Sequence, residues 1–274
     1  MRLRRSEQLL LGYFSYTTLI GLAVGVRTVP LVELLAINAA IAIGFLFLLS
    51  RIPIDQEWRD LLPYPFGLLC YREAGWLAPV IAPHDLEQRW VPWDRLVLDT
   101  LHGRSALESL GAVIPTVLEA AYLSVYIIAL LAVGALYWFG RREQVDRLWF
   151  AFLLGLMLSY VQFPFWPSEP PRTVFPGHDL PAFEGPLRRL NLFVVGNYGI
   201  HSSVFPSAHV SGAMAGSLML RRLMPEHRWA GNAMLTIAIL IAVSTVYGRY
   251  HYLVDAVAGA AVGVVAYRLA LRSP

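Results

Sequence analysis

Charge and cysteine are both scarce in this sequence. Only 15% of its 274 residues are charged, against roughly 25% in soluble domains, and 57% are hydrophobic. This balance would leave large apolar patches in water, so the composition excludes an ordinary soluble domain and indicates a membrane protein. The single cysteine, Cys70, excludes an intramolecular disulfide framework and any metal site built from several cysteines.

Lysine is absent, and every basic residue is an arginine. The 22 basic and 19 acidic residues give a formal net charge of +3. Most arginines flank apolar runs, where they meet anionic lipid headgroups. A nucleic-acid-binding protein would need a clustered basic face on a soluble module, which this sequence lacks. We therefore expect a membrane partner and no nucleic-acid partner.

Seven stretches fit membrane-spanning helices, which need about 20 predominantly apolar residues. They are Leu9–Val26, Pro30–Ser50, Pro115–Phe139, Leu148–Phe165, Ser207–Met224, Trp229–Gly248 and Tyr252–Leu271. The last three contain several small residues, which permit close packing of helices in lipid. The stretch from Arg51 to Ser109 mixes Trp and Pro with charge, which predicts interfacial helices. Within it, Leu61–Ala82 is a candidate for a distorted or re-entrant element.

The arginines also predict an orientation in the membrane. Clusters at 140–147 and 221–228 and at the C-terminal tail fall on one side of the predicted bundle, and the positive-inside rule makes that side cytoplasmic. The Pro164–Phe205 loop and the turn at Arg249–His251 then lie on the extracytoplasmic side. Seven spans would place the basic amino terminus there too, against the rule. Either the first hairpin is not two full spans, or Leu61–Ala82 crosses.

Ionisable residues at the ends of predicted spans form the candidate site, because such residues are costly to keep in a membrane. Three clusters qualify: PSEPPR ending at Arg172, FPSAH ending at His209, and YGRYHYLVD with Arg249, His251 and Asp255. On a helix, residues four apart share a face, so the side chains of His251 and Asp255 can pair. The carboxylate would fix the imidazole tautomer and leave the other nitrogen free to attack.

The other two clusters supply groups that bind an anion. His209 follows Pro-Ser-Ala at a helix start, where free backbone N–H groups face a ligand. Arginines supply planar donors for phosphate oxygens. A nucleophile, its orienting carboxylate, a second histidine as acid and an anion cradle together predict phosphoryl transfer. No acidic residue sits at ligand spacing around His209, so we expect no metal.

The order of these motifs resembles a known family. PSAH, then HYLVD some forty residues later and AG after it, resembles the type 2 phosphatidic acid phosphatase superfamily between about Leu148 and Leu271. PPR upstream of PSAH looks most like the branch related to inositol phosphorylceramide synthase. The resemblance implies an all-α, polytopic membrane helical bundle with a core of about six spans plus extra N-terminal and interfacial helices. Residues 1–109 would form the hairpin and interfacial helices, and residues 110–274 the catalytic bundle.

The resemblance also implies roles for individual residues. His209 would protonate the leaving group, His251 would attack phosphorus to give a phosphohistidine, and Asp255 would orient the nucleophile. The residues expected to bind phosphate are Arg172, Ser207, Ala208 and Arg249. No cofactor or metal is implied. The substrate would be a phospholipid or another lipid phosphate.

Three positions depart from the family pattern. Ala208 stands where the second motif usually has glycine, and Phe165 replaces the first motif's lysine. Thr245 replaces the third motif's arginine, but Arg249 follows four residues later, which is one helical turn. We therefore expect the Arg249 guanidinium to point into the same cavity as Arg172.

Three functions fit these residues. The first is a lipid-phosphate phosphatase or phosphotransferase that works through a phosphohistidine. The second is an inositol- or sugar-type headgroup phosphotransferase acting on a lipid acceptor. The third is a non-catalytic protein that binds or transports lipid headgroups. Because the three candidate clusters lie on the side opposite the arginine clusters, we expect a multi-pass protein with its active site on the extracytoplasmic side.

Overall fold

A computed structural model describes residues 3–25, 29–53, 55–78, 84–177, 179–200 and 202–272. All regular secondary structure in these ranges is helical, as the composition predicts. The predicted spans all coincide with helices. Val26, the last residue of the first predicted span, and residues 79–82 of the Leu61–Ala82 stretch lie outside the described residues.

The first half of the chain contains a long hairpin, the 15-residue helix α4 and several short helices. Their bounds are α1 (Arg5–Val24), α2 (Leu31–Arg51), α3 (Glu57–Leu61), α4 (Pro63–Leu77), α5 (Asp85–Arg95), the π-helical turn η1 (Leu96–Thr100) and α6 (Gly103–Glu108). The short helices α5 and α6 fall within the stretch where the sequence predicts interfacial helices.

The second half contains the remaining long helices. Their bounds are α7 (Val113–Leu123), η2 (Ser124–Tyr126), α8 (Ile128–Trp138), η3 (Arg142–Gln144), α9 (Val145–Tyr160), η4 (Phe163–Phe165), α10 (Pro171–Val174), α11 (Pro186–Tyr198), α12 (Ala208–Leu223), η5 (Pro225–His227), α13 (Arg228–Tyr247) and α14 (Leu253–Arg272).

Four helical segments among the described residues are long and apolar enough to cross a membrane. They are Leu31–Arg51, Arg142–Phe165, Pro225–Tyr247 and Leu253–Arg272. Helices α7 and α8 are bent by 74° at a short break and form either a fifth, broken span or a re-entrant loop. The chain is therefore an all-α helical membrane bundle. The other two predicted spans form α1 and α12, which do not meet the same length and hydropathy criteria.

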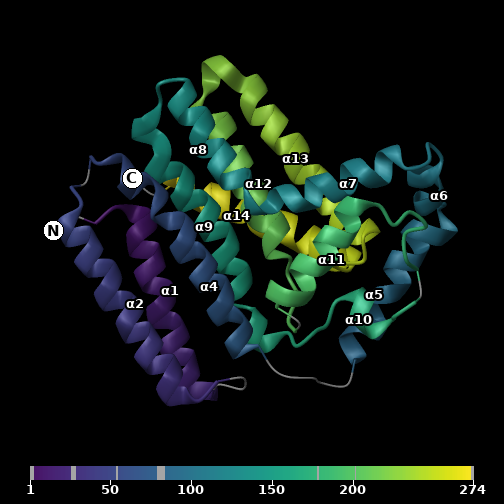
Figure 1. Cartoon of the computed structure of the whole chain (residues 1–274), viewed down its shortest axis with the longest axis horizontal. Coiled ribbons are helices and arrows are strands. Elements are labelled where there is room, and N and C mark those ends of the chain that lie inside the picture. Colours follow the sequence, from purple (N-terminus) through teal and green to yellow (C-terminus); the bar gives the residue numbers. More distant parts are fainter. Residues whose placement is uncertain are drawn as a thin grey trace.

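The path of α4 bears on the amino-terminal orientation. At one end of the bundle, Arg4 Nη1 lies 2.5 Å from Asp60 Oδ1, and Ser6 Oγ donates to Asp146 Oδ1 at 2.6 Å. At the other end, the Tyr71 hydroxyl of α4 accepts from the Ile200 N–H at 2.7 Å. Helix α4, with 15 residues, thus extends from the end that holds Arg4 towards the other end, but it is shorter than the helices that can cross a membrane. Both ends of the chain lie at the same end of the bundle (Figure 1).

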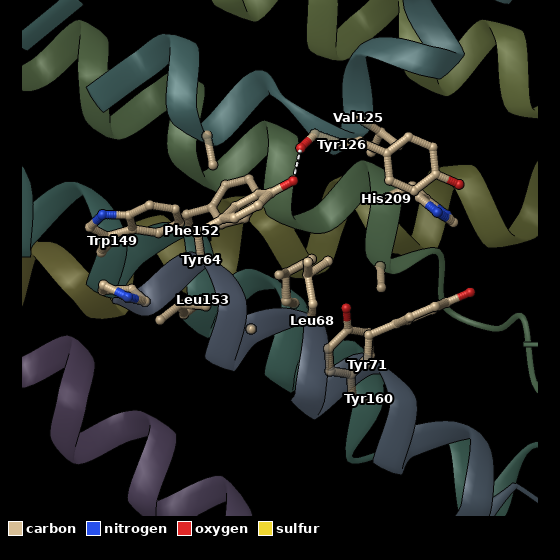
Figure 2. A pocket seen from close by; sticks show the side chains of 15 residues that line it. Tyr64, Leu68, Tyr71, Val125, Tyr126, Trp149, Phe152, Leu153, Tyr160 and His209 are labelled. Carbon is tan, nitrogen blue, oxygen red and sulfur yellow. Dashed lines mark hydrogen bonds between the residues drawn. The ribbon is translucent and has the colours of Figure 1, made fainter. Parts of the chain in front are cut away.

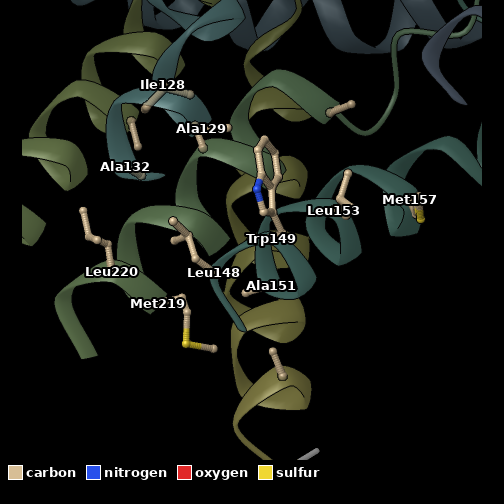
Figure 3. Packing of buried hydrophobic residues seen from close by; sticks show 14 of the residues in the cluster. Ile128, Ala129, Ala132, Leu148, Trp149, Ala151, Leu153, Met157, Met219 and Leu220 are labelled. Carbon is tan, nitrogen blue, oxygen red and sulfur yellow. The ribbon is translucent and has the colours of Figure 1, made fainter. Parts of the chain in front are cut away.

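Helix α12 lies at the centre of the catalytic half and packs against α9, α13 and α14. The apolar core between α8, α9 and α12 includes the fully buried Trp149, Leu220 and Met219 (Figure 3). The Trp149 indole N–H also donates to the Asp60 carbonyl oxygen at 2.8 Å, which ties α3 to α9. The core therefore holds α9 and α12 side by side.

Glycines let the neighbouring helices approach the backbone of α12 closely. A Cβ on Gly155 of α9 would lie 2.6 Å from the Ser211 carbonyl oxygen. A Cβ on Gly259 of α14 would lie 2.5 Å from the Ser207 carbonyl oxygen, and one on Gly263 would lie 2.7 Å from that of Ser211. Real Cβ atoms do not approach backbone oxygens this closely, so a larger residue would push α12 away from its neighbours.

We expect Gly259→Ala to destabilise the protein by about 1–3 kcal/mol, because backbone atoms cannot yield to the added methyl group. Gly134→Ala in α8 is the matched control, since a Cβ there meets no atom within 4 Å. The control should be neutral or slightly stabilising. Thermal unfolding of the purified protein in detergent measures both effects. Equal unfolding temperatures for the two variants would contradict the close-packing account.

Candidate active site

The three motifs predicted from the sequence meet at one end of the bundle. The Arg172 N–H donates to the Arg249 carbonyl oxygen at 3.3 Å, which joins the first motif to the third. The Ser207 N–H donates to the Asp255 carbonyl oxygen at 3.0 Å, which joins the second motif to the third. Backbone hydrogen bonds therefore fix the relative positions of all three segments.

His209, His251 and Asp255 form a continuous chain of polar contacts. His209 Nδ1 lies 3.1 Å from His251 Nε2, and His251 Nδ1 lies 3.3 Å from Asp255 Oδ2. An Asp255 carboxylate can only accept, so His251 Nδ1 carries the proton in this arrangement. His251 Nε2 then carries an unprotonated lone pair, which accepts a hydrogen bond from the His209 Nδ1–H. The nucleophilic nitrogen predicted from the sequence faces the second histidine.

The local structure explains how these side chains are held. Helix α12 begins at Ala208, and the Ser207 hydroxyl oxygen caps it by accepting from the Val210 N–H at 3.4 Å. His209 therefore lies in the first helical turn, as the sequence predicts. The Ser207 hydroxyl is occupied as a helix cap, and the described lining of the polar cavity includes Ala208 but not Ser207.

His251 and Asp255 pair by a different route from the one predicted. Helix α14 begins only at Leu253, so His251 lies in the loop before it and the two residues do not share a helix face. The Asp255 side chain instead reaches back over the first turn, where its Oδ2 also accepts from the Tyr252 N–H at 2.9 Å. The expected contact is present, but the loop produces it rather than helical spacing.

Arg172, His209 and His251 line one polar cavity. The Arg172 guanidinium donates from Nη1 to the Tyr250 carbonyl oxygen at 3.4 Å, and it lies 5.7 Å from the centre of the Tyr250 ring. No carboxylate partner of Arg172 occurs among the described residues. Its positive charge is thus available to an anion in the cavity.

The environment of His251 favours the neutral imidazole. Burial lowers the pKa of His251, and the nearby positive charge of Arg172 lowers it further. An imidazole without a proton on Nε2 is the form that attacks phosphorus. The electrostatics of the loop therefore suit a nucleophile.

Arg249 is placed differently from the sequence-based expectation. It is 1% exposed, and its Nη1 lies 2.6 Å from Asp94 Oδ2 in α5 rather than in the cavity lined by Arg172. The prediction extrapolated a helical turn from Thr245, but α13 ends at Tyr247 and Arg249 has a φ of 62°. This left-handed residue turns the chain, so helical spacing does not apply.

Asp94 is a residue that sequence reasoning missed. Besides its ion pair with Arg249, its Oδ1 accepts from the Leu253 N–H at 2.8 Å, at the first residue of α14. One buried carboxylate thus binds both ends of the loop that carries His251. No sequence pattern indicates this role, because Asp94 lies among other charged residues of an interfacial stretch.

Glu119 of α7 is the second missed residue. Its carboxylate accepts from Arg188 Nη1 at 2.9 Å, from Asn191 Nδ2 at 2.7 Å and from the Tyr250 hydroxyl at 2.7 Å. The ring of Tyr250 stacks on Tyr122 with centroids 3.9 Å apart. This network holds Tyr250, whose carbonyl and ring contact Arg172. An acidic residue inside a predicted span is a detectable signal.

An apolar slot leads to His209 from the middle of the bundle. Its walls come from α4, the break between α7 and α8, α9 and the start of α12. Figure 2 shows Trp149 and Phe152 towards one end and His209 with Tyr126 at the other. The Tyr64 hydroxyl donates to the Tyr126 carbonyl oxygen at 2.7 Å and ties α4 to the break. The slot and the polar cavity share Tyr71, Tyr126, Ala208 and His209.

Comparison with protein families agrees with this arrangement. Residues 94–269, more than half of the chain, match the PAP2 superfamily. The chain belongs to the PAP2 superfamily. No curated protein and no solved structure matched it. PAP2 proteins are generally phosphatases or phosphotransferases, which places this chain in that broad enzyme class. Its apolar helices indicate an integral membrane protein.

The PAP2 match begins at Asp94, and α4, which forms one wall of the slot, lies before it. The N-terminal half therefore contributes directly to the surroundings of His209. Within the described residues, no group of three or more His, Cys, Asp or Glu side chains is arranged to hold a metal ion.

Removing one partner of the buried Asp94–Arg249 pair leaves an uncompensated charge. We expect Asp94→Asn and Arg249→Met each to destabilise the protein by about 3–5 kcal/mol. The double variant buries neither charge, so its loss of stability should be well below the sum of the losses in the two single variants. Thermal unfolding of the four proteins in detergent measures this coupling. Additive losses would show that the two side chains do not interact.

Proposed function

We propose that this protein is a lipid-phosphate phosphatase or phosphotransferase that works through a phosphohistidine on His251. The observation that carries the proposal is the Asp255–His251–His209 chain in a cavity that also holds the uncompensated cation Arg172. A nucleophile with its orienting carboxylate, a second histidine and an anion-binding arginine are the parts that phosphoryl transfer requires.

In the first step, the lone pair of His251 Nε2 attacks phosphorus and the bond from phosphorus to the leaving oxygen breaks. His209, protonated beside the bound phosphate, donates its proton to that oxygen. The Asp255 carboxylate stabilises the positive charge that develops on the His251 ring. Arg172 and the N–H groups at the start of α12 bind the phosphate oxygens.

In the second step, an incoming hydroxyl attacks the phosphohistidine. His209, now neutral, takes the proton of that hydroxyl, and the bond between Nε2 and phosphorus breaks. Water as acceptor gives a phosphatase, whereas an alcohol gives a headgroup transferase. The motif resemblance to inositol phosphorylceramide synthase supports testing an inositol or sugar hydroxyl as the alcohol.

The apolar slot supports a lipid as the substrate. It ends at His209, so a hydrocarbon chain lying in it would leave an attached phosphate beside the histidines. We further infer that the site opens on the extracytoplasmic side. The arginine clusters at 140–147 and 221–228 lie at the opposite end of the bundle from His209, and the positive-inside rule makes that end cytoplasmic.

We expect His251→Ala to abolish turnover and to prevent formation of an acid-labile phosphoenzyme, because the attacking nitrogen is lost. His209→Ala should still be labelled by an aryl phosphate, whose leaving group needs no protonation, but should not cleave an alkyl phosphate. Rapid quenching with a radiolabelled phosphate substrate measures the label. Labelling that persists in His251→Ala contradicts the assigned nucleophile, and wild-type protein without turnover on any lipid phosphate supports the non-catalytic alternative.

The slot is tested by narrowing it. Leu68→Trp adds bulk to the slot lining, and we expect the KM for long-chain lipid phosphates to rise about tenfold, the effect of roughly 1.4 kcal/mol. Short-chain substrates should be unaffected. Leu69→Trp is the matched control, because Leu69 is similarly exposed on α4 but does not line the slot. Equal KM changes for both chain lengths would contradict the slot's role.

A further inference from the structure

A second polar pocket lies at the end of the bundle opposite the histidines. It is lined by Arg221 and Arg222 from the last turn of α12, Arg228 from the first turn of α13, and Leu218, Pro225 and Tyr267. It is an open depression of about 230 Å³, which has room for a phosphate group.

The close crossing of α12 and α13 brings the arginines together. A Cβ on Gly231 would lie 2.4 Å from the Arg221 Cα, so the two backbones are in direct contact. Arg228 precedes Gly231 by three residues and shares its face of α13. The short η5 turn closes the connection between the helices. The three guanidinium groups are therefore held near one another by the fold.

None of these three arginines has an ion pair or a side-chain hydrogen bond within the described part of the chain. The acidic residue of the connecting turn, Glu226, is paired with Arg141 at 2.9 Å. Two fully buried arginines near the active site, by contrast, have carboxylate partners: Arg188 has Glu119 and Arg249 has Asp94. All three side chains are exposed, and three like charges around one open pocket attract an anion.

The helix that begins at the pocket adds to this positive field. Helix α13 has 20 residues and no acidic residue in its first turn, and no side chain caps its start. Its free N–H groups and the positive end of its dipole therefore accompany Arg228.

We propose that this pocket binds a phosphate anion, and specifically that it takes the phosphate of an anionic lipid in the leaflet opposite the active site. The guanidinium groups would bind the phosphate oxygens, and Leu218 and Tyr267 give the pocket a less polar wall beside the headgroup. This site is separate from the catalytic cavity and does not depend on the proposed chemistry.

The test compares two double variants of the full-length protein in nanodiscs. Arg222→Gln with Arg228→Gln removes two charges from the pocket. Arg268→Gln with Arg272→Gln removes two charges from the same end of the bundle but outside the pocket. The discs contain phosphatidylcholine mixed with phosphatidylglycerol. Native mass spectrometry then counts the phosphatidylglycerol molecules that stay bound to each protein. We expect about tenfold weaker retention in the pocket variant, as loss of charge-assisted hydrogen bonds predicts, and less than twofold in the control.

A second arm distinguishes lipid from free phosphate. Inorganic phosphate is added to the protein in discs of phosphatidylcholine alone, and thermal unfolding is followed. Phosphate bound at the histidine site stabilises the wild type and both variants alike. Extra stabilisation of the wild type and the control, lost in the pocket variant, would support the pocket but assign it to a soluble anion rather than a lipid.

Two results would overturn the proposal. One is an equal loss of phosphatidylglycerol from both double variants, which would mean general attraction to a basic surface. The other is a wild-type protein that retains no phosphatidylglycerol and gains no pocket-dependent stability from phosphate. If the pocket pair unfolds in neutral discs, the single variant Arg222→Gln replaces it, and retention equal to wild type contradicts the site.

Discussion

The close approach of α12 to α9 and α14 is the constraint on which the candidate site depends. His209 and His251 are far apart in the sequence, yet their ring nitrogens lie 3.1 Å apart. The distance requires the start of α12 to sit directly against the start of α14, where Gly259 meets the Ser207 backbone. On the opposite side, the Ser211 hydroxyl donates to the Gly155 carbonyl oxygen at 2.8 Å and holds α12 on α9.

Charge is distributed so that the supporting groups are neutralised and the cavity is not. Arg249 and Arg188 are each held by a buried carboxylate, and each pair fixes part of the loop between α13 and α14. The Arg172 guanidinium, by contrast, contacts a carbonyl oxygen and the ring of Tyr250 in that loop. A substrate phosphate would therefore meet one uncompensated arginine and two histidines whose positions are already fixed. Pre-ordered groups of this kind lower the cost of stabilising a charged transition state.

The sequence predicted the helices well because their apolar runs are long, and it predicted the motif residues because ionisable groups at span ends are unusual. It failed where the chain leaves regular structure. The position of Arg249 was predicted from helical spacing, but α13 ends at Tyr247 and Arg249 itself has a left-handed backbone conformation. Helical spacing therefore does not predict where its side chain points. Asp94 was invisible because its importance comes from a contact with a segment 155 residues away. Glu119, an acid within an apolar span, was recognisable in principle.

We propose that the phosphoryl group passes through a covalent intermediate on His251. The stereochemical course at phosphorus tests it most directly, with a thiophosphate substrate made chiral by oxygen isotopes. Two successive in-line displacements, one by His251 and one by the acceptor, give net retention of configuration, which is the predicted result. Net inversion would show a single direct attack by the acceptor and would contradict the phosphohistidine mechanism.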